Sequence, residues 1–263
     1  MNIPKTMKAA VLHGPKDLRV ETVPVPEPGP AEVLVRVRGC AICGTDRVIV
    51  EHGWPHQPPY GEFIPGHEFT GEVIAVGREV DEFAPGDRVA VEPTKGCGRC
   101  TNCLKGLYTA CLNYGNKRKG HKHVGHTANG GYAEFATHAV ANVHHLPDNL
   151  TYEEGTLVTT AGSALYGLER AGGVEAGETV AILGPGPVGL LTMQFARALG
   201  AGRIILVGIN QWSLKTGKEL GADELVNAAE EDAVGKVKAL TGGAGANLVV
   251  ECSGNPSSAE VAP

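Results

Sequence analysis

The chain has 263 residues, of which 42% are hydrophobic and 20% are charged, and its formal net charge is −6. These values are typical of a globular protein with one large or two ordinary domains, and they argue against intrinsic disorder. The acidic balance and the absence of lysine or arginine runs argue against nucleic acid and anionic membranes as partners. No apolar stretch reaches the roughly eighteen residues of a membrane span, and residues 1–14 lack a signal-peptide core, so a cytoplasmic protein is expected.

The first half of the chain has the texture of a β domain. Short β-like runs stand between Pro/Gly turns, at Val33–Val37, Gly71–Val76 and Arg88–Val91. Helical periodicity is scarce in this half. We therefore predict a mostly β domain that covers residues 1–155.

After Leu150, strands and helices alternate. Thr151 is suited to cap a helix or helix pair that extends to Ala171. Strand patterns follow at Thr179–Leu183, Arg203–Val207, Glu224–Val226 and Leu248–Glu251, with helical patterns at Val188–Leu199, around Leu214–Leu220 and before the last strand. This alternation predicts βαβ units and a parallel sheet over residues 156–263, so the fold class is α/β.

A glycine loop joins the first of these strands to its helix. The segment Gly184-Pro185-Gly186-Pro187-Val188-Gly189 has the spacing G-x-G-x-x-G. In a dinucleotide site the first glycine makes the tight turn, the second admits the pyrophosphate, and the third lets helix and strand pack closely. A plain Gly/Pro turn is the alternative. The flanking strand and helix favour a nicotinamide dinucleotide, held at Gly184, Gly186, Pro187, Val188 and Gly189.

The end of the second strand bears on the choice between NAD and NADP. A site that prefers NAD normally has an acidic side chain there, on the ribose 2′-hydroxyl. This chain has Gly208-Ile209-Asn210 instead, without a carboxylate. The lack of an acid slightly favours NADP, with Gly208 and Asn210 at the cofactor and Ser213 or Lys215 as further contacts. A loose choice of cofactor is the open alternative.

Four cysteines lie close together in a lobe at about residues 94–115. Cys97, Cys100, Cys103 and Cys111 have the spacing C-x2-C-x2-C-x7-C, which suits a closed tetrahedral zinc site. An iron–sulfur cluster uses similar spacing, and disulfides are disfavoured in the cytosol. A structural zinc ion is therefore predicted. The nearby cations are interpreted as solvated surface: Lys105, Lys117, Arg118 and Lys119.

A second group of zinc-ligand types lies nearer the N-terminus. Cys43 follows Cys40, and His67 and Glu68 follow after a Pro-rich loop. A thiolate, an imidazole and a carboxylate can hold zinc and leave a fourth position for substrate. The alternative is that the cysteines are small buried residues and that His67 and Glu68 form a surface pair. Five other histidines are interpreted as ordinary loop residues, the last three of them exposed: His52, His56, His121, His123 and His126.

Five motifs occur in an order that resembles the zinc-containing medium-chain alcohol dehydrogenase family. They are Cys43-Gly44-Thr45-Asp46, Gly66-His67-Glu68, the four-cysteine lobe, Gly130-Gly131-Tyr132-Ala133-Glu134 and the glycine loop, and the resemblance covers the chain from Met7 onward. It implies a GroES-like catalytic domain joined to a Rossmann domain, two zinc ions, and NAD or NADP. It also implies that Cys43 and His67 ligate the catalytic zinc with Glu68 at or near it, and that the four cysteines hold the structural zinc.

The resemblance further implies an activity. A hydride would pass between a primary or secondary alcohol or polyol and NAD(P), with the Thr45 hydroxyl passing the alcohol proton outward. A sugar or threonine dehydrogenase of the same family is an open variant, and a zinc-free quinone reductase is disfavoured by the intact cysteine sets. A non-catalytic remnant that binds zinc and nucleotide is the alternative from another class. A homo-oligomer is expected of the full-length family.

Two positions depart from the family's pattern. The family has a further cysteine or glutamate ligand twenty-five residues before the first loop glycine, where this chain has Thr159. We expect water or Glu68 to complete the zinc shell. The histidine that many members carry five residues after the first zinc cysteine, as the outer end of a proton relay, is Val48 here, and His52 or His56 in that role is the alternative to an ordinary loop histidine. The chain also stops at Pro263 after about four strands of a sheet that normally has six, which indicates a missing C-terminal part.

Overall fold

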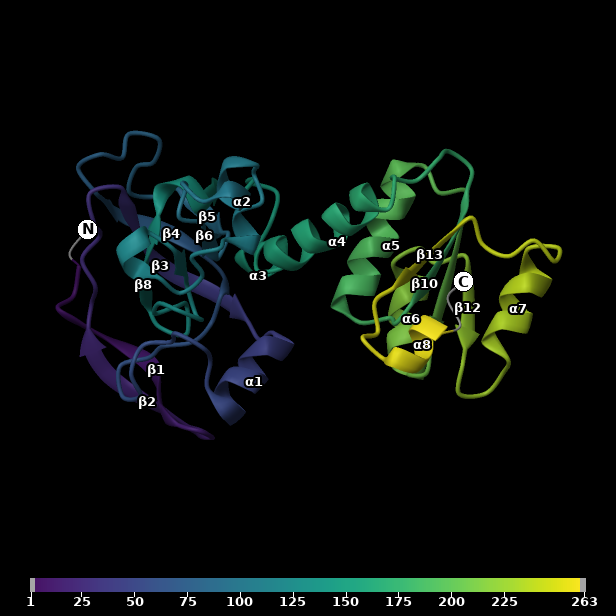
Figure 1. Cartoon of the computed structure of the whole chain (residues 1–263), viewed down its shortest axis with the longest axis horizontal. Helices are drawn as coiled ribbons and strands as arrows, with labels where there is room; N and C mark the ends of the chain where they lie inside the picture. Colours follow the sequence, from purple (N-terminus) through teal and green to yellow (C-terminus); the bar gives the residue numbers. More distant parts are fainter. Residues whose placement is uncertain (1–2, 261–263) are drawn as a thin grey trace. The chain divides into compact units, whose positions relative to one another are not determined.

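The computed structural model describes residues 3–260, which divide into two compact units that meet between Thr159 and Thr160 (Figure 1). Each unit has its own sheet and its own hydrophobic core. Within residues 3–260 no helix is both long and apolar enough to cross a membrane.

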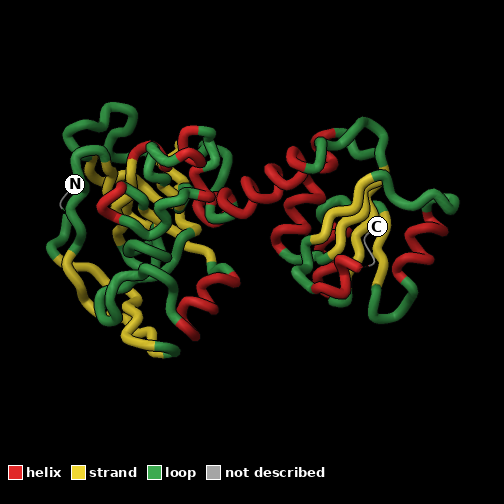
Figure 2. Tube along the Cα trace, in the orientation of Figure 1, coloured by secondary structure: helices red, strands yellow, loops and turns green. Residues whose placement is uncertain are grey.

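The first unit consists mainly of strands and loops (Figure 2). Its strands are β1 (Thr6–Gly14), β2 (Asp17–Pro24), β3 (Glu32–Ala41), β4 (Glu68–Val76), β5 (Arg88–Val91), β6 (Thr94–Lys95), β7 (Lys122–His123), β8 (Phe135–Ala139) and β9 (Val143–His145). Its helices are α1 (Gly44–His52), α2 (Thr101–Leu104) and α3 (Tyr152–Gly155), with 3₁₀ turns η1 (Tyr108–Ala110), η2 (Lys117–Lys119) and η3 (Val140–Asn142). Strands β8-β3-β4-β5-β9 form an antiparallel sheet, and β1-β2 and β6-β7 pair separately.

Strand β3 lies between β8 and β4 in the five-stranded sheet and is covered on both faces. Successive side chains of a strand point to opposite faces. Val33 and Val35 therefore enter one core, with Phe69 and residues of β4 and β5, whereas Leu34 enters a second core that contains Met7. Burial on both faces fixes the register of β3 against β4, because a slip by one residue would exchange the two sets.

The second unit is built around a parallel sheet. Its elements are α4 (Val158–Arg170), which begins at the boundary, β10 (Thr179–Leu183), α5 (Pro187–Leu199), β11 (Arg203–Gly208), α6 (Gln211–Glu219), β12 (Glu224–Asn227), α7 (Ala233–Leu240), β13 (Leu248–Glu251) and α8 (Pro256–Glu260). All strand pairs are parallel and the order is β12-β11-β10-β13. The α/β fold class and the four strands expected from the sequence are confirmed.

Helices cover both faces of this sheet (Figure 1). Val180 and Ile182 of β10 pack on one side against α4, α5 and α6, through residues such as Met193. Ala181 and Leu183 point the other way and pack against α7. The unit is therefore doubly wound, as a Rossmann-type sheet requires.

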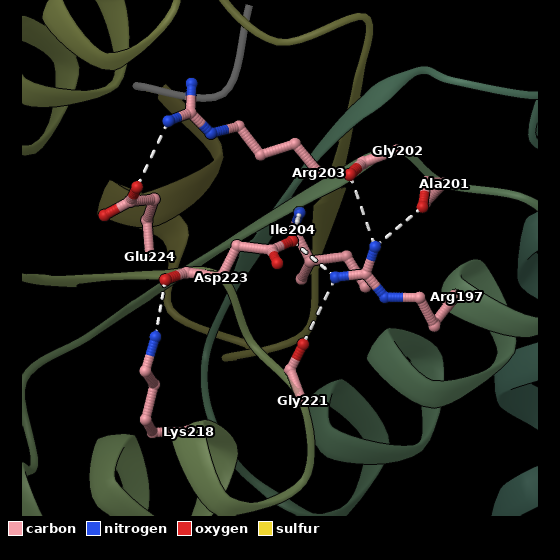
Figure 3. A network of polar contacts seen from close by, with 9 residues as sticks. All are labelled: Arg197, Ala201, Gly202, Arg203, Ile204, Lys218, Gly221, Asp223 and Glu224. Atoms are coloured by element: carbon pink, nitrogen blue, oxygen red, sulfur yellow. Dashed lines mark hydrogen bonds and ion pairs between the residues drawn. The ribbon is translucent and has the colours of Figure 1, made fainter.

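A polar network joins the starts of β11 and β12 to the end of α5 (Figure 3). The Arg197 guanidinium donates to the carbonyls of Ala201 at 2.8 Å and Gly221 at 3.3 Å, and it also binds the Asp223 carboxylate. Asp223 in turn accepts the backbone N–H of Ile204 at 2.7 Å. Hydrogen bonds from Arg197 and Ile204 hold the pKa of Asp223 below its ordinary value against the opposing effect of burial. The network holds together the N-terminal ends of β11 and β12, whereas the glycine loop follows the C-terminal end of β10.

The cap of α3 agrees with the sequence analysis, whereas α1 was not expected. The Thr151 hydroxyl accepts the N–H of Glu154 at 3.1 Å, and the Glu154 carboxylate accepts the N–H of Thr151 at 2.8 Å. Helix α1 begins after Cys43, whose N–H donates to the carboxylate of Asp46 at 2.8 Å. Such reciprocal caps stabilise a first turn. A cap at Cys43 has consequences for the site described next.

Candidate metal centres and cofactor cavity

The register of β3 and β4 brings Cys43 to His67 and Glu68. Ala41, the last residue of β3, pairs with Glu68, the first residue of β4. Cys43 follows β3 almost at once, as the N-cap of α1. Residues on either side of the 44–66 segment, which contains α1, therefore meet at the end of β3 and the start of β4, and the doubly buried β3 holds them there.

Three side chains of metal-ligand type converge at this place. One ligand atom each of Cys43, His67 and Glu68 lies within 4.8 Å of the others. His67 and Glu68 are buried and Cys43 is half-buried. A thiolate, an imidazole and a carboxylate bind Zn²⁺ at about 2.0–2.3 Å, so ligand atoms at these separations fit such an ion.

Asp46 links the members of this group, a role that sequence reasoning missed. Its Oδ1 lies 3.3 Å from Nδ1 of His67. Its Oδ2 accepts the N–H of Cys43 at 2.8 Å and the hydroxyl of Tyr132 at 2.8 Å. Asp46 is 2% exposed. A carboxylate on the outer nitrogen of a metal-binding histidine fixes the ring and its tautomer. Asp46 and Tyr132 both belong to motifs named in the sequence analysis. Only the contacts in the structure show that Asp46 orients His67 and Cys43 and that Tyr132 binds Asp46.

The same contacts shift the pKa values of Cys43 and His67. A hydrogen bond with His67 is the main cause that lowers the pKa of the Cys43 thiol, and the backbone and hydroxyl of Thr45 add to it against burial. Burial lowers the pKa of His67, but hydrogen bonds with Asp46 and Cys43 outweigh it and raise that pKa to about 9. Thr45 stands two residues after Cys43, in the first turn of α1. Because metals bind thiolate and neutral imidazole, metal binding at this place releases protons.

The four cysteines of the lobe form a separate cluster. All four sulfur atoms lie within 4.8 Å of one another. The Sγ atoms of Cys97 and Cys103 are 3.9 Å apart, as are those of Cys100 and Cys111. A disulfide would need about 2.05 Å. A tetrahedron with zinc–sulfur bonds of about 2.3 Å has edges of about 3.8 Å, so the donor set fits a closed zinc site.

N–H groups point at these sulfur atoms. The Asn113 amide donates to Sγ of Cys97 at 3.2 Å, and the Cys103 backbone donates to Sγ of Cys100 at 3.4 Å. Hydrogen bonds from the backbone of Arg99 and from Asn113 lower the pKa of Cys97 to about 6. Thiolates are the form that binds metal. The cations interpreted as solvated surface are exposed: Lys105, Lys117, Arg118 and Lys119.

The interpretation of three histidines as exposed is wrong. His121 and His126 are only 1% and 7% exposed, and His123 is half-buried. The ring of His123 stacks on His126 with centroids 3.9 Å apart, and the ring of His126 lies 4.6 Å from that of His67. Pairing of β7 with β6 carries this segment inward, and its Gly125 packs on the backbone of Gly66. Contacts between residues so far apart in the chain cannot be predicted from the local sequence around the histidines.

The loop histidines near the site and the two positions that depart from the family's pattern are placed as follows. His56 is an exposed loop residue, as interpreted, whereas His52 is exposed but ends α1. Val48 is 45% exposed on the same helix. Thr159 is half-buried in the first turn of α4.

The glycine loop has the geometry of a phosphate cradle. Gly184 adopts a φ of 100°, in the left-handed region that favours glycine. A Cβ on Gly189 would lie 2.0 Å from the carbonyl oxygen of Gly184, so helix α5 and the loop pack too closely for any side chain there. A Cβ on Gly186 would meet nothing within 4 Å, which leaves the backbone open to a ligand. These three positions fit a dinucleotide pyrophosphate at the start of α5.

A cavity of about 700 Å³ opens beside this loop. Four of the predicted cofactor residues line it: Gly184, Gly186, Gly208 and Asn210. Ser213 lines it too. Among the residues that the structure describes, Pro187, Val188 and Gly189 do not reach the cavity wall; they form the first turn of α5. A cavity of this size is sufficient for a cofactor.

Comparison with known proteins agrees with this geometry. Residues 29–148 match the alcohol dehydrogenase GroES-like domain, and residues 187–263 match the zinc-binding dehydrogenase family. Sorbitol dehydrogenase of Bacillus subtilis strain 168 is 36% identical over 264 residues, which cover 99% of this chain and 72% of that protein. Alcohol dehydrogenase of Geobacillus stearothermophilus is 36% identical over 249 residues, with 94% and 71% covered.

A solved structure is also similar. It is a putative zinc-binding dehydrogenase from Sinorhizobium meliloti 1021 bound to NADP, with a TM-score of 0.87 and 34% sequence identity. The likeness covers 97% of this chain and 72% of that one.

Proposed function

Because this chain belongs to the zinc-containing medium-chain alcohol dehydrogenase family, we propose that it transfers a hydride between a primary or secondary alcohol or polyol and NAD(P). The observation that carries the proposal is the convergence of Cys43, His67 and Glu68 where β3 ends and β4 begins. The sorbitol dehydrogenase relative supports a polyol as the substrate class.

Cys43, His67 and Glu68 would hold the catalytic zinc, and Cys97, Cys100, Cys103 and Cys111 the structural zinc, so we propose two zinc ions per chain. When bound at the first site, zinc supplies Lewis acidity toward a substrate oxygen. The Asp46 carboxylate would hold the His67 ring in place through Nδ1 of the ring, which leaves Nε2 of His67 for the metal. Reduced cysteines suit the cytoplasmic location that we propose.

Thr45 would handle the alcohol proton. It stands two residues after Cys43 in the first turn of α1, and the residue is half-buried, which suits a path between the site and solvent. A hydroxyl can accept a proton from one side and release its own to the other. The glycine loop and the cavity wall at Gly208 and Asn210 would hold the cofactor, with Pro187, Val188 and Gly189 setting the helix start that faces its phosphates.

The test is cofactor reduction by zinc-loaded protein with a straight-chain primary alcohol, a secondary alcohol and sorbitol. NAD⁺ and NADP⁺ are supplied in separate assays. Turnover with at least one combination of alcohol and cofactor supports the proposal. Retention of zinc and cofactor without turnover of any alcohol would favour a non-catalytic binding protein instead.

Variants of Thr45 separate its proton function from its effect on the metal. Thr45→Ala should lower turnover about a hundredfold or more while the zinc content stays the same. Thr45→Ser keeps the hydroxyl and is the matched control, expected to retain most of the activity. Unchanged turnover in Thr45→Ala would remove Thr45 from the proton path.

A further inference from the structure

The segment around the four-cysteine lobe carries cations but no carboxylates. Residues 93–133 contain no aspartate or glutamate, in a chain whose net charge is −6. Seven cations lie in this segment: Lys95, Arg99, Lys105, Lys117, Arg118, Lys119 and Lys122. Among the residues that the structure describes, Lys122 pairs with Glu32 and none of the other six takes part in an ion pair. Such a cluster of uncompensated cations makes a local positive potential that attracts anions.

A hollow of about 490 Å³ opens in this segment. Two of the unpaired cations, Lys117 and Arg118, line it. The other described residues of its wall are His56, Leu112, Asn113, Tyr114, Gly115 and Asn116, so none of them is acidic. A hollow of this volume can admit a small organic anion.

His56 and Gly115 form one wall of the hollow by close packing. His56 has a φ of 63°, in the left-handed region that residues other than glycine rarely adopt. Gly115 has a φ of 71°, and a Cβ on it would lie 2.4 Å from Cγ of His56. The imidazole ring therefore lies directly on the Gly115 backbone. The N–H of Gly115 points the other way, to Nδ1 of the buried His121 at 3.1 Å.

The polar groups left for a ligand in this hollow are mainly donors. Asn113 is already engaged, because its side-chain oxygen accepts the Lys119 ammonium at 3.0 Å. The side-chain oxygen of Asn116 accepts the backbone N–H of Lys119 at 3.2 Å, which leaves the NH₂ group of Asn116 as a donor. The Lys117 ammonium and the Arg118 guanidinium can only donate. A ligand that accepts hydrogen bonds and carries negative charge matches this set.

Buried side chains hold the hollow from behind. Nε1 of Trp54 donates to the hydroxyl of Tyr114 at 2.7 Å. The ring of Trp54 lies 4.8 Å from that of His126, which lies 4.6 Å from that of His67. The wall at Tyr114 is therefore anchored on the same buried layer as the candidate catalytic metal group. A wall fixed in this way loses little freedom when a ligand binds.

We propose that this hollow is an anion site that binds a phosphate group, carried by the free ion or by a phosphate monoester. The oxygens of a phosphate can accept from the ammonium of Lys117, the guanidinium of Arg118 and the amide of Asn116. The site consists of residues of the first unit alone, apart from the metal ligands, and it does not depend on the proposed function. It gives Lys117 and Arg118 a function beyond that of a solvated surface.

The test is isothermal titration calorimetry of inorganic phosphate, and separately of sorbitol 6-phosphate, into the zinc-loaded protein at constant ionic strength. Lys117→Ala/Arg118→Ala should weaken binding at least about tenfold, because charge-assisted hydrogen bonds are lost at two exposed positions. Tighter binding of the ester than of the free ion would support a phosphorylated ligand, and equal binding would support the free ion. No binding of either probe up to about 10 mM, or unchanged binding in the double variant, would overturn the site.

Two control variants separate the hollow from other places where phosphate could bind. Lys95→Ala/Lys105→Ala removes two cations of the same segment that do not line the hollow, and it should change the affinity by no more than about twofold. An equal loss in both double variants would reduce the effect to diffuse charge and would overturn the site. Cys43→Ala/His67→Ala should still bind phosphate, and loss of binding there would assign the anion to the metal instead.

Discussion

Asp46→Asn tests whether the candidate catalytic metal site depends on a single buried carboxylate. The carboxylate has donors on both sides: the N–H of Cys43 and the hydroxyl of Tyr132 at Oδ2, and Nδ1 of His67 at Oδ1. An asparagine has the same shape but only one oxygen. If that oxygen keeps the Cys43 N–H, the amide NH₂ faces Nδ1 of His67 and favours the tautomer whose Nε2 carries the proton. That tautomer cannot bind a metal through Nε2.

The expected loss of zinc affinity is about tenfold to a hundredfold, or about 1.4 to 2.8 kcal/mol, the usual effect of removing a carboxylate behind a metal-binding histidine. Competition with a chromophoric chelator at fixed pH measures it. The four-cysteine site should be unaffected, and Asp17→Asn, at a half-buried acid of the same unit that pairs with Arg19 away from the metal-ligand group, is the matched control. An Asp46→Asn protein with wild-type affinity at both sites would refute the reasoning.

Three further predictions concern the cofactor loop, the polar network and pH. Gly189→Ala should abolish dinucleotide binding measured by calorimetry, because the new Cβ would lie 2.0 Å from the carbonyl oxygen of Gly184. Gly162→Ala is the control, at a helical glycine with open space around it, and this variant should bind the dinucleotide normally. Asp223→Ala should lower the unfolding free energy in urea by about 1–3 kcal/mol, since it leaves the buried N–H of Ile204 unpaired; a change no larger than that of an exposed acid such as Glu230→Ala would contradict this. Burial lowers the pKa of His138 from 6.5 to about 4. Between these two pH values the unfolded chain binds a proton at His138 that the folded chain does not bind. The free energy of unfolding therefore falls as pH drops from about 6.5 to about 4, by up to about 1.4 kcal/mol per pH unit. His138→Gln should show a shallower slope in pH-dependent urea unfolding, and an identical slope would exclude His138 as a cause.

The second unit could be predicted from sequence almost element by element, because its signals are local. Strands Thr179–Leu183 and Leu248–Glu251 are the observed β10 and β13. Each is a short, mostly apolar run, and a glycine lies within three residues after it, Gly184 and Gly254, respectively. Successive side chains of a strand point to opposite faces of a sheet, so the burial of Val180 on one face and Ala181 on the other also follows from the sequence.

The first unit could be predicted less well, because its site depends on pairing between distant residues. Motifs pointed to Cys43 and His67, but nothing local shows that Asp46 contacts both of them. The burial of His121 and His126 follows from the β6–β7 pairing and the packing of Gly125 on Gly66. In the same way, the hollow in the basic segment requires His56 to pack on Gly115, a contact that no residue spacing encodes.

The zinc content per chain tests the central claim most directly. Metal analysis by plasma emission on wild-type protein and on a Cys43→Ala/His67→Ala variant should give two zinc ions and one zinc ion, respectively, because only the converging Cys43, His67 and Glu68 group is lost. One zinc ion in both proteins, or two in both, would show that this group does not hold the metal and would contradict the account.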